Sequence, residues 1–157
     1  MTAPKIDQKL ADANLLLTGG KQAKLSDYRG KPLVLYFYPK ASTAGCTQEG
    51  LDFTAAINKF RRQSCNILGA SRDGLKAQEN FKTKQGFAFD LISDKEEILC
   101  KAMDVIKMKN MYGKKLLGIE RSTFLIDAEG VLRKEWRKVK VKGHVEEVLE
   151  AVKALKK

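Results

Sequence analysis

The feature that most constrains the fold is an unbroken apolar run, Leu33–Tyr38 (LVLYFY), enclosed by Pro32 and Pro39. A run of this length bounded by prolines is typical of a central strand that is buried on both faces of a sheet. It is far shorter than the roughly 18 residues that a membrane-spanning helix requires. The run therefore predicts a core strand under covering helices, and it predicts no transmembrane segment.

The other segments alternate between strand and helix patterns, with Asp73 and Asp94 as the expected N-terminal caps of the second and third helices. This order predicts one domain, residues 1–157, of the α/β class: a central mixed β-sheet flanked by helices, similar to the thioredoxin fold. In chain order we expect an N-terminal β-hairpin at 15–25, strands at 33–38 and 66–70, a helix carrying Phe53, Ala56, Ile57 and Phe60, helices at about 74–85 and 98–103, a loop at 107–118, a hairpin of strands 122–127 and 131–136, and a terminal helix carrying Val145, Val148, Leu149, Val152 and Leu155.

The chain is basic, with 30 Lys and Arg against 19 Asp and Glu and a net charge of +11. Such an excess can bind polyanions without sequence specificity. The densest basic stretch, residues 133–142, alternates charged and apolar side chains as the solvated face of a strand does. No zinc finger, basic helix or aromatic RNA-binding motif accompanies it. A solvated basic face is the favoured interpretation, and a nucleic-acid-binding module is the minor alternative.

The three cysteines, Cys46, Cys65 and Cys100, form an odd and sparse set, which argues against a secreted disulfide framework. Zinc ligands usually come in pairs about two to four residues apart, which disfavours a metal site made of these thiols and His144. His144 is expected to be a solvated residue at the start of the last helix. The first twenty residues contain acidic side chains and lack the pattern of an export signal. We therefore expect a cytoplasmic protein in which a reactive thiol works largely alone.

Cys46 follows the loop 39–45 and stands near the start of a predicted helix, where a thiolate can act as a nucleophile. Making the thiolate of an ordinary cysteine predominant at neutral pH requires about 3 kcal/mol. A helix N-terminus supplies about 0.3–1 kcal/mol, so a second positive group is needed. The only histidine, His144, offers no Cys/His arrangement. An arginine is the natural substitute, because it stays charged and its forked donors can hold two oxygen atoms at once.

Residues 36–49, YFYPKASTAGCTQE, contain the pattern Pro-x-x-x-Thr-x-x-Cys and resemble the peroxidatic loop of the peroxiredoxins. The likeness runs from about residue 25 to the C-terminus, and its details resemble the bacterioferritin comigratory protein branch, also called peroxiredoxin Q. It implies a thiol-dependent peroxidase that reduces hydrogen peroxide and organic hydroperoxides in antioxidant defence, with no metal, haem or flavin. The further matching blocks are 51–53 (LDF), 69–73 (GASRD), 84–87 (KQGF) and 118–127 (GIERSTFLID).

The resemblance also implies a role for each residue of the loop. Cys46 would be the peroxidatic cysteine, which attacks the O–O bond and becomes a sulfenic acid. Thr43 and Arg121 would position the peroxide and stabilise the thiolate. Pro39 would shape the loop and shield the sulfenate, and Glu49 would orient Arg121.

The chain departs from the branch at two places. Ala44 stands where the branch usually has a proline, which leaves the loop with more freedom in the unfolded state, a modest effect of about 0.4–1 kcal/mol. The branch also has a resolving cysteine either five or about thirty-six residues after the peroxidatic one. Those positions hold Leu51 and Lys82 here, so neither has a thiol.

The other two thiols are weak substitutes for a resolving cysteine. Cys65 precedes the second core strand whereas Cys46 follows the first, so parallel strands would put them at opposite ends of the sheet, too far apart for a disulfide. Cys100 lies on a short amphipathic helix, and its position leaves a role open. We therefore predict a one-cysteine mechanism, in which an external thiol such as thioredoxin or glutaredoxin reduces the sulfenate. The sequence shows no strong self-complementary patch, so we expect a monomer. The alternative is a peroxide sensor that relays oxidation to a partner protein.

Overall fold

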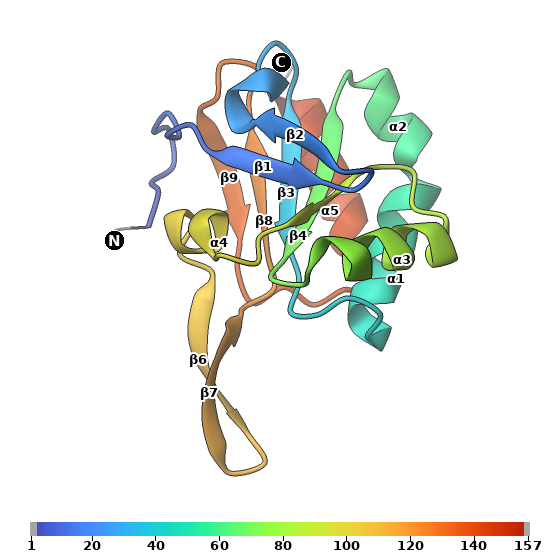
Figure 1. The fold of residues 1–157 in the computed structure, drawn as a ribbon. Helices are drawn as coiled ribbons and strands as arrows, with labels where there is room; N and C mark the ends of the chain where they lie inside the picture. Colours follow the sequence, from blue (N-terminus) through green and yellow to red (C-terminus); the bar gives the residue numbers. More distant parts are fainter. Residues whose placement is uncertain (1–2, 156–157) are drawn as a thin grey trace.

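The computed structural model describes residues 3–155, and its elements follow the predicted order closely (Figure 1). Within these residues no helix is both long and apolar enough to cross a membrane. The strands are β1 (Asn14–Leu17), β2 (Lys21–Lys24), β3 (Leu33–Phe37), β4 (Asn66–Ser71), β5 (Leu91–Ser93), β6 (Ile106–Met111), β7 (Lys114–Ile119), β8 (Ser122–Ile126) and β9 (Leu132–Trp136). The helices are the 3-10 turn η1 (Leu25–Tyr28), α1 (Ala44–Ala55), α2 (Ile57–Arg62), α3 (Leu75–Gln85), α4 (Ile98–Ala102) and α5 (His144–Ala154).

Seven strands form one mixed sheet in the order β2-β1-β5-β4-β3-β8-β9. β3 is parallel to β4 and antiparallel to β8, and every residue of β3 is buried, as the apolar run predicts. Helices flank this sheet (Figure 1), so the predicted α/β, thioredoxin-like fold with an N-terminal β-hairpin is confirmed. The hairpin is β1 and β2, which pair antiparallel across the turn at residues 18–20.

The core lies in two layers, one on each face of the sheet. One layer holds the buried side chains of α1, α2 and α5 together with Phe81 of α3, and it includes Cys46 and Cys65. The other holds side chains of α4, β1 and η1, and it includes Cys100. Alternate residues of β3 supply the two layers, with Tyr36 in the first and Phe37 in the second, because successive side chains of a strand point to opposite faces.

Strand pairing brings three chain segments to one edge of the sheet. Phe37, the last residue of β3, pairs with Ser122, the first residue of β8, and with Ala70 near the end of β4. The chain that leaves β3 toward α1, the chain that enters β8 and the chain that leaves β4 therefore meet at this edge. Arg121 stands directly before β8, so the sheet delivers it next to the start of α1.

The predicted loop at 107–118 is wrong, because these residues form a hairpin of β6 and β7. The two strands make a separate sheet, and in β7 four consecutive side chains, residues 114–117, are exposed, so this strand lacks the alternation of a half-buried strand. The turn residues Tyr112 and Gly113 both have positive φ, which is the geometry of a tight two-residue hairpin turn. Gly113 and the alternation of apolar and charged residues at 106–109 are the sequence signals for this hairpin.

Three local predictions about the helices also need correction. The first helix is interrupted at Ala56, so that α1 and α2 are separate segments. Gly74, and not Asp73, is the N-cap of α3. Asp94 is not the N-cap of α4, although its carboxylate accepts hydrogen bonds from the backbone N–H groups of Leu99 and Cys100 at 3.1 and 2.7 Å. Asp94 thus accepts the hydrogen bonds of backbone N–H groups that have no partner within the helix, although it lies outside the helix itself.

His144 is buried, which corrects the expectation of a solvated residue. Its side chain is 4% exposed, and its Nε2 lies 2.7 Å from the hydroxyl of Thr123 on β8. The imidazole edge also contacts the rings of Phe53 and Trp136. Tertiary packing decides this burial, since the helix position alone leaves the ring free to face water.

We predict that His144 makes folding sensitive to acid. Burial lowers the pKa of His144 to about 4 from its ordinary 6.5, so the unfolded chain takes up the proton first as the pH falls. The buried neutral imidazole therefore makes its full contribution to the free energy of unfolding above pH 6.5, and this contribution is lost between about pH 6.5 and 4. The unfolding free energy of the wild type relative to His144→Gln should fall by about 3 kcal/mol between pH 7 and 4. Urea titrations at several pH values measure it, and a difference that does not change with pH would contradict the prediction.

Candidate active site

Cys46 lies in the first turn of α1, three residues after the N-cap residue Thr43. The loop before it runs from the end of β3, so the central strand of the sheet aims the thiol at the edge described above. The backbone N–H groups of this first turn carry partial positive charge and favour an anion. Cys46 is only 1% exposed, so the thiol sits in a site that largely excludes water.

Glu49 and Arg121 complete the immediate surroundings of the thiol. Glu49 is one helical turn after Cys46, and residues three apart lie on the same face of a helix. The Arg121 guanidinium spans the two: one nitrogen donates to Glu49 Oε1 at 2.7 Å, and another lies 3.4 Å from Cys46 Sγ. The structure thus brings together three of the residues that the sequence singled out.

Burial and the contacts within this group together set the pKa values of Glu49 and Arg121. Burial raises the pKa of Glu49 to about 7, and the Arg121 guanidinium limits the rise. Burial also works against the charge of Arg121, but Glu49 and Cys46 outweigh it and hold the Arg121 pKa above its ordinary value. Arg121 is therefore a permanent cation beside the thiol. The second oxygen of Glu49, Oε2, is buried and accepts no hydrogen bond from the residues that the structure describes.

Thr43 and Pro39 belong to the segment that joins β3 to α1. The Thr43 hydroxyl donates to the backbone carbonyl of Lys40 at 2.8 Å, and the side chain is exposed. Pro39 is half-buried at the bend that follows β3. Among the residues that the structure describes, no hydrogen bond joins either side chain to the thiol.

Asp73 is a residue of the site that the sequence analysis missed. Its carboxylate accepts a hydrogen bond from the backbone N–H of Ala41 at 2.8 Å and one from the hydroxyl of Ser71 at 2.5 Å. These contacts tie the loop before Cys46 to the end of β4. The signal was available, because Asp73 follows the strand parallel to β3, and the ends of neighbouring parallel strands meet at one edge.

Comparison with known proteins identifies the family. The model of the AhpC/TSA family matches residues 6–135. The chain is 58% identical over 143 residues to peroxiredoxin Bcp of Xanthomonas campestris, covering 91% of this chain and 89% of that one. It is also 50% identical over 149 residues to peroxiredoxin Bcp of Bacillus subtilis, covering 95% of both. This chain is a peroxiredoxin. It belongs to the Bcp, or peroxiredoxin Q, branch, and it is therefore a thiol peroxidase.

Solved structures agree with this assignment. A structure of the X. campestris bacterioferritin comigratory protein, from work on its alkyl peroxide reduction activity, is 56% identical and covers 92% of each chain with a TM-score of 0.89. A cysteine-to-serine mutant of PrxQ from Xylella fastidiosa is 45% identical, covers the whole of both chains and has a TM-score of 0.94. Both the sequence and the backbone of this peroxiredoxin thus follow the branch over more than nine-tenths of the chain.

The two remaining cysteines of this peroxiredoxin lie away from Cys46. Cys65 precedes β4, at the end of the sheet opposite the site, because β3 and β4 run in the same direction. Cys100 is on α4, in the core layer of the opposite face of the sheet. Burial and the neighbouring Asp94 raise the pKa of the Cys100 thiol, so this thiol stays protonated. For Cys100 to act as a resolving cysteine, its sulfur would have to reach Cys46 on the other face of the sheet.

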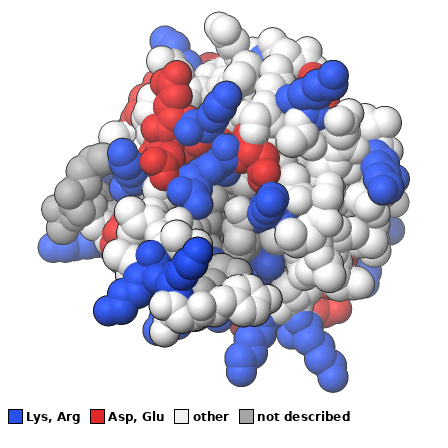
Figure 2. Space-filling view, turned by 60° about the horizontal axis from the view of Figure 1, so that its bottom comes forward, with Lys and Arg blue, Asp and Glu red and all other residues white. Residues whose placement is uncertain are grey.

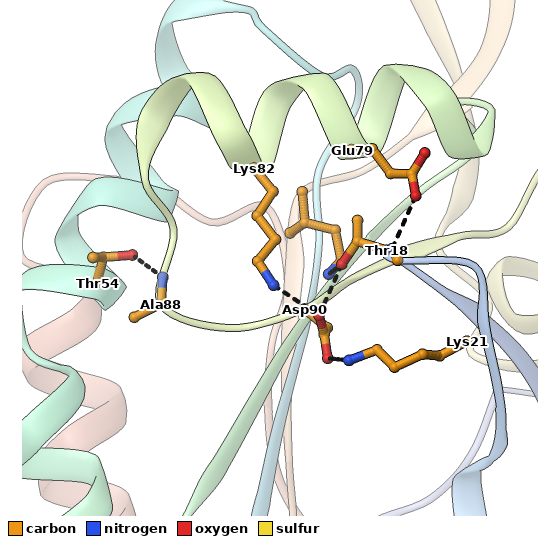
Figure 3. A network of polar contacts seen from close by, with 9 residues as sticks. Thr18, Lys21, Thr54, Glu79, Lys82, Ala88 and Asp90 are labelled. Carbon is orange, nitrogen blue, oxygen red and sulfur yellow. Dashed lines mark hydrogen bonds and ion pairs between the residues drawn. The ribbon is translucent and has the colours of Figure 1, made fainter.

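The two positions where the branch carries a resolving cysteine are occupied by ordinary structural side chains. Leu51 is half-buried on α1 and packs against the core. Lys82 projects from α3 and donates to Asp90 at 2.8 Å, and Asp90 also accepts bonds from Lys21 and Thr18 (Figure 3). These contacts fasten α3 to the N-terminal hairpin at this point.

Proposed function

We propose that Cys46 is the nucleophile of this thiol peroxidase and that it reduces hydrogen peroxide and organic hydroperoxides. The observation that carries the proposal is the Arg121 guanidinium, which is held by buried Glu49 and directed at Cys46 Sγ. A fixed cation at 3.4 Å, added to the helix N-terminus, supplies the second positive group that a reactive thiolate requires. The alkyl peroxide reduction activity of the X. campestris relative supports organic hydroperoxides as a substrate class.

In the oxidative step, the Cys46 thiolate attacks one oxygen of the peroxide and the O–O bond breaks. Cys46 becomes a sulfenic acid, and the other oxygen takes up a proton and leaves as water or an alcohol. Negative charge moves from sulfur onto the leaving oxygen, so a fixed guanidinium beside both atoms lowers the barrier. Arg121 is suited to this because its donors stay charged and need no reorganisation.

Thr43 and Pro39 are proposed to form the peroxide-binding wall. Because the Thr43 hydroxyl donates its hydrogen bond to the Lys40 carbonyl, its oxygen lone pairs remain available to accept a hydrogen bond from the peroxide O–H group. Pro39 restricts the loop at the end of β3, and Asp73 anchors the same loop through Ala41. The loop is therefore held in place before the peroxide arrives.

In the reductive step, an external thiol is proposed to restore the enzyme. The thiol condenses with the Cys46 sulfenic acid, which forms a mixed disulfide and releases water. A second reductant thiol then attacks the first reductant sulfur, so that Cys46 is released as a thiolate and the two reductant sulfurs form a disulfide. The positions of Cys65 and Cys100, and the side chains at Leu51 and Lys82, support this one-cysteine route. Thioredoxin and glutaredoxin are proteins of the required class. A reducing compartment, the cytoplasm, suits such a cycle, and we propose that the protein acts there as a monomer.

The intact mass of the reduced protein after one equivalent of peroxide tests this proposal. With a sulfenate-trapping reagent present, we expect one adduct that maps to Cys46, because neither other thiol can reach it. Cys100→Ala should give the same adduct and the same peroxide turnover with dithiothreitol. A loss of two hydrogens without an adduct would show an internal disulfide and would contradict the one-cysteine route.

A further inference from the structure

The β6–β7 hairpin projects from the body of the protein beside the active-site edge (Figure 1). It carries four of the six large apolar side chains that are exposed in the described chain: Met108, Tyr112, Leu116 and Leu117, with Tyr112 fully exposed. Scattered apolar side chains are normal on a protein surface, but a group on one projecting element marks an interaction site. The remaining two, Ile6 and Ile98, lie on separate segments.

The hairpin is also positively charged. Residues 106–119 contain four lysines, Lys107, Lys109, Lys114 and Lys115, and no acidic residue. Figure 2, which turns the lower end of Figure 1 toward the viewer, shows Lys and Arg side chains spread over this end of the molecule. A second copy of the chain would bring like charges together, whereas an acidic partner complements the hairpin.

The base of the hairpin is joined directly to the active site. Glu120 alone separates the end of β7 from Arg121, and Arg72 donates to the Leu117 carbonyl at 3.3 Å. Lys109 lies across Gly118, with its Cδ 3.2 Å from the point where a side chain at that residue would begin. Burial and the nearby Arg121 lower the pKa of Lys109, while the charge of Cys46 opposes that change. A protein held on this hairpin would therefore stand next to the thiol.

We propose that the β6–β7 hairpin is the docking surface for the external reductant, an acidic thiol protein with an apolar rim around its reactive cysteine. This inference rests on the proposed one-cysteine function, in which such a protein must form a mixed disulfide with Cys46. Cys46 is 1% exposed, so random collision with a large partner rarely aligns the two sulfurs. Apolar contacts would hold the partner, and the lysines would steer it toward the site.

The test compares a protein reductant with a small one. Leu116→Ser/Leu117→Ser is assayed with thioredoxin, thioredoxin reductase and NADPH, and separately with dithiothreitol. We expect kcat/KM for thioredoxin to fall at least about tenfold, since two exposed leucines lose their burial against the partner. Turnover with dithiothreitol and the oxidation of Cys46 by peroxide should not change. Ile98→Ser is the matched control, an equally exposed apolar residue on α4, and it should behave as the wild type.

A charge reversal tests the second part of the surface. Lys114→Glu/Lys115→Glu should raise KM for thioredoxin at least about tenfold and remove its dependence on salt, because Lys107 and Lys109 then face two glutamates and the neutral hairpin no longer attracts an acidic partner. Arg61→Glu/Arg62→Glu, a matched reversal on α2, should leave both unchanged.

Each other outcome has a defined meaning. If the hairpin variants have the same kcat/KM for thioredoxin as their controls, the docking proposal is overturned. It is also overturned if the hairpin variants change the molecular mass of the protein in solution, because the hairpin would then be an interface between copies of the chain. If the wild type turns over with dithiothreitol but not with thioredoxin or glutaredoxin, the proposed partner class is wrong. Failure of Cys46 to react with peroxide in the absence of any reductant would instead overturn the proposed function itself.

Discussion

Cys46→Ser should lose peroxide reduction by at least about 10³-fold, down to the rate of the thiol reductant alone. A serine hydroxyl is not ionised at neutral pH and is a far weaker nucleophile than a thiolate, so neither Arg121 nor the helix N-terminus can compensate for the lost sulfur. Serine has nearly the same shape, and the variant should therefore stay folded. Peroxide consumption with dithiothreitol measures the loss, and circular dichroism verifies the fold.

The other two cysteines supply the matched controls for this experiment. Cys65 lies at the end of the sheet far from Cys46, and Cys100 lies in the core layer on the opposite face of the sheet. Both Cys65→Ala and Cys100→Ala should therefore keep the wild-type rate of peroxide consumption. Their thermal stability will fall modestly, because each substitution removes a buried sulfur atom. Retained activity in Cys46→Ser, or its loss in Cys65→Ala with the fold intact, would mean that the nucleophile has been assigned wrongly.

Arg121→Ala should lower the rate constant for oxidation by peroxide by about 10²–10³-fold. The substitution removes the cation that lies 3.4 Å from the sulfur and that faces the developing charge on the leaving oxygen. Stopped-flow measurement of Cys46 oxidation isolates this step from reduction by thiols. Arg133→Ala removes an arginine of β9 that contacts Asp7 and Asp127 beyond the other end of β8, and this control should oxidise at the wild-type rate.

Arg121→Ala should also lower the free energy of unfolding, and a second variant separates this effect from the slower oxidation. Without Arg121, the fully buried Glu49 carboxylate has no positive partner at pH 8, which costs about 3–5 kcal/mol. Adding Glu49→Gln removes the buried charge, so the double variant should regain most of the unfolding free energy while peroxide oxidation stays slow. Recovery of the rate together with the stability would show that Arg121 acts only through folding.

The central architecture of this peroxiredoxin could be predicted from local patterns. The apolar run of β3, the glycines of the first turn and the apolar stripe of α5 each depend on neighbouring residues, so the sequence displays them directly. Asp73 and Asp94 show the limit of such patterns. Both are near helix starts, but one holds the loop at Ala41 and the other binds amides beyond the N-cap, because long-range pairing decides where a carboxylate finds its donors.

For the active site, the resemblance to a family supplied Cys46, Arg121 and Glu49, and chain order supplied the position of the thiol at a helix start. By itself the sequence thus determined the fold class and the absence of a thiol at positions 51 and 82, and it predicted Cys46 as the reactive thiol. Only the tertiary structure decided that Arg121 spans Glu49 and Cys46, that His144 is buried, that Cys100 lies across the sheet, and that residues 106–119 form an exposed hairpin. The physical reason is that these features depend on strand order and on which side chains exclude water together, and both join residues that lie far apart in the chain.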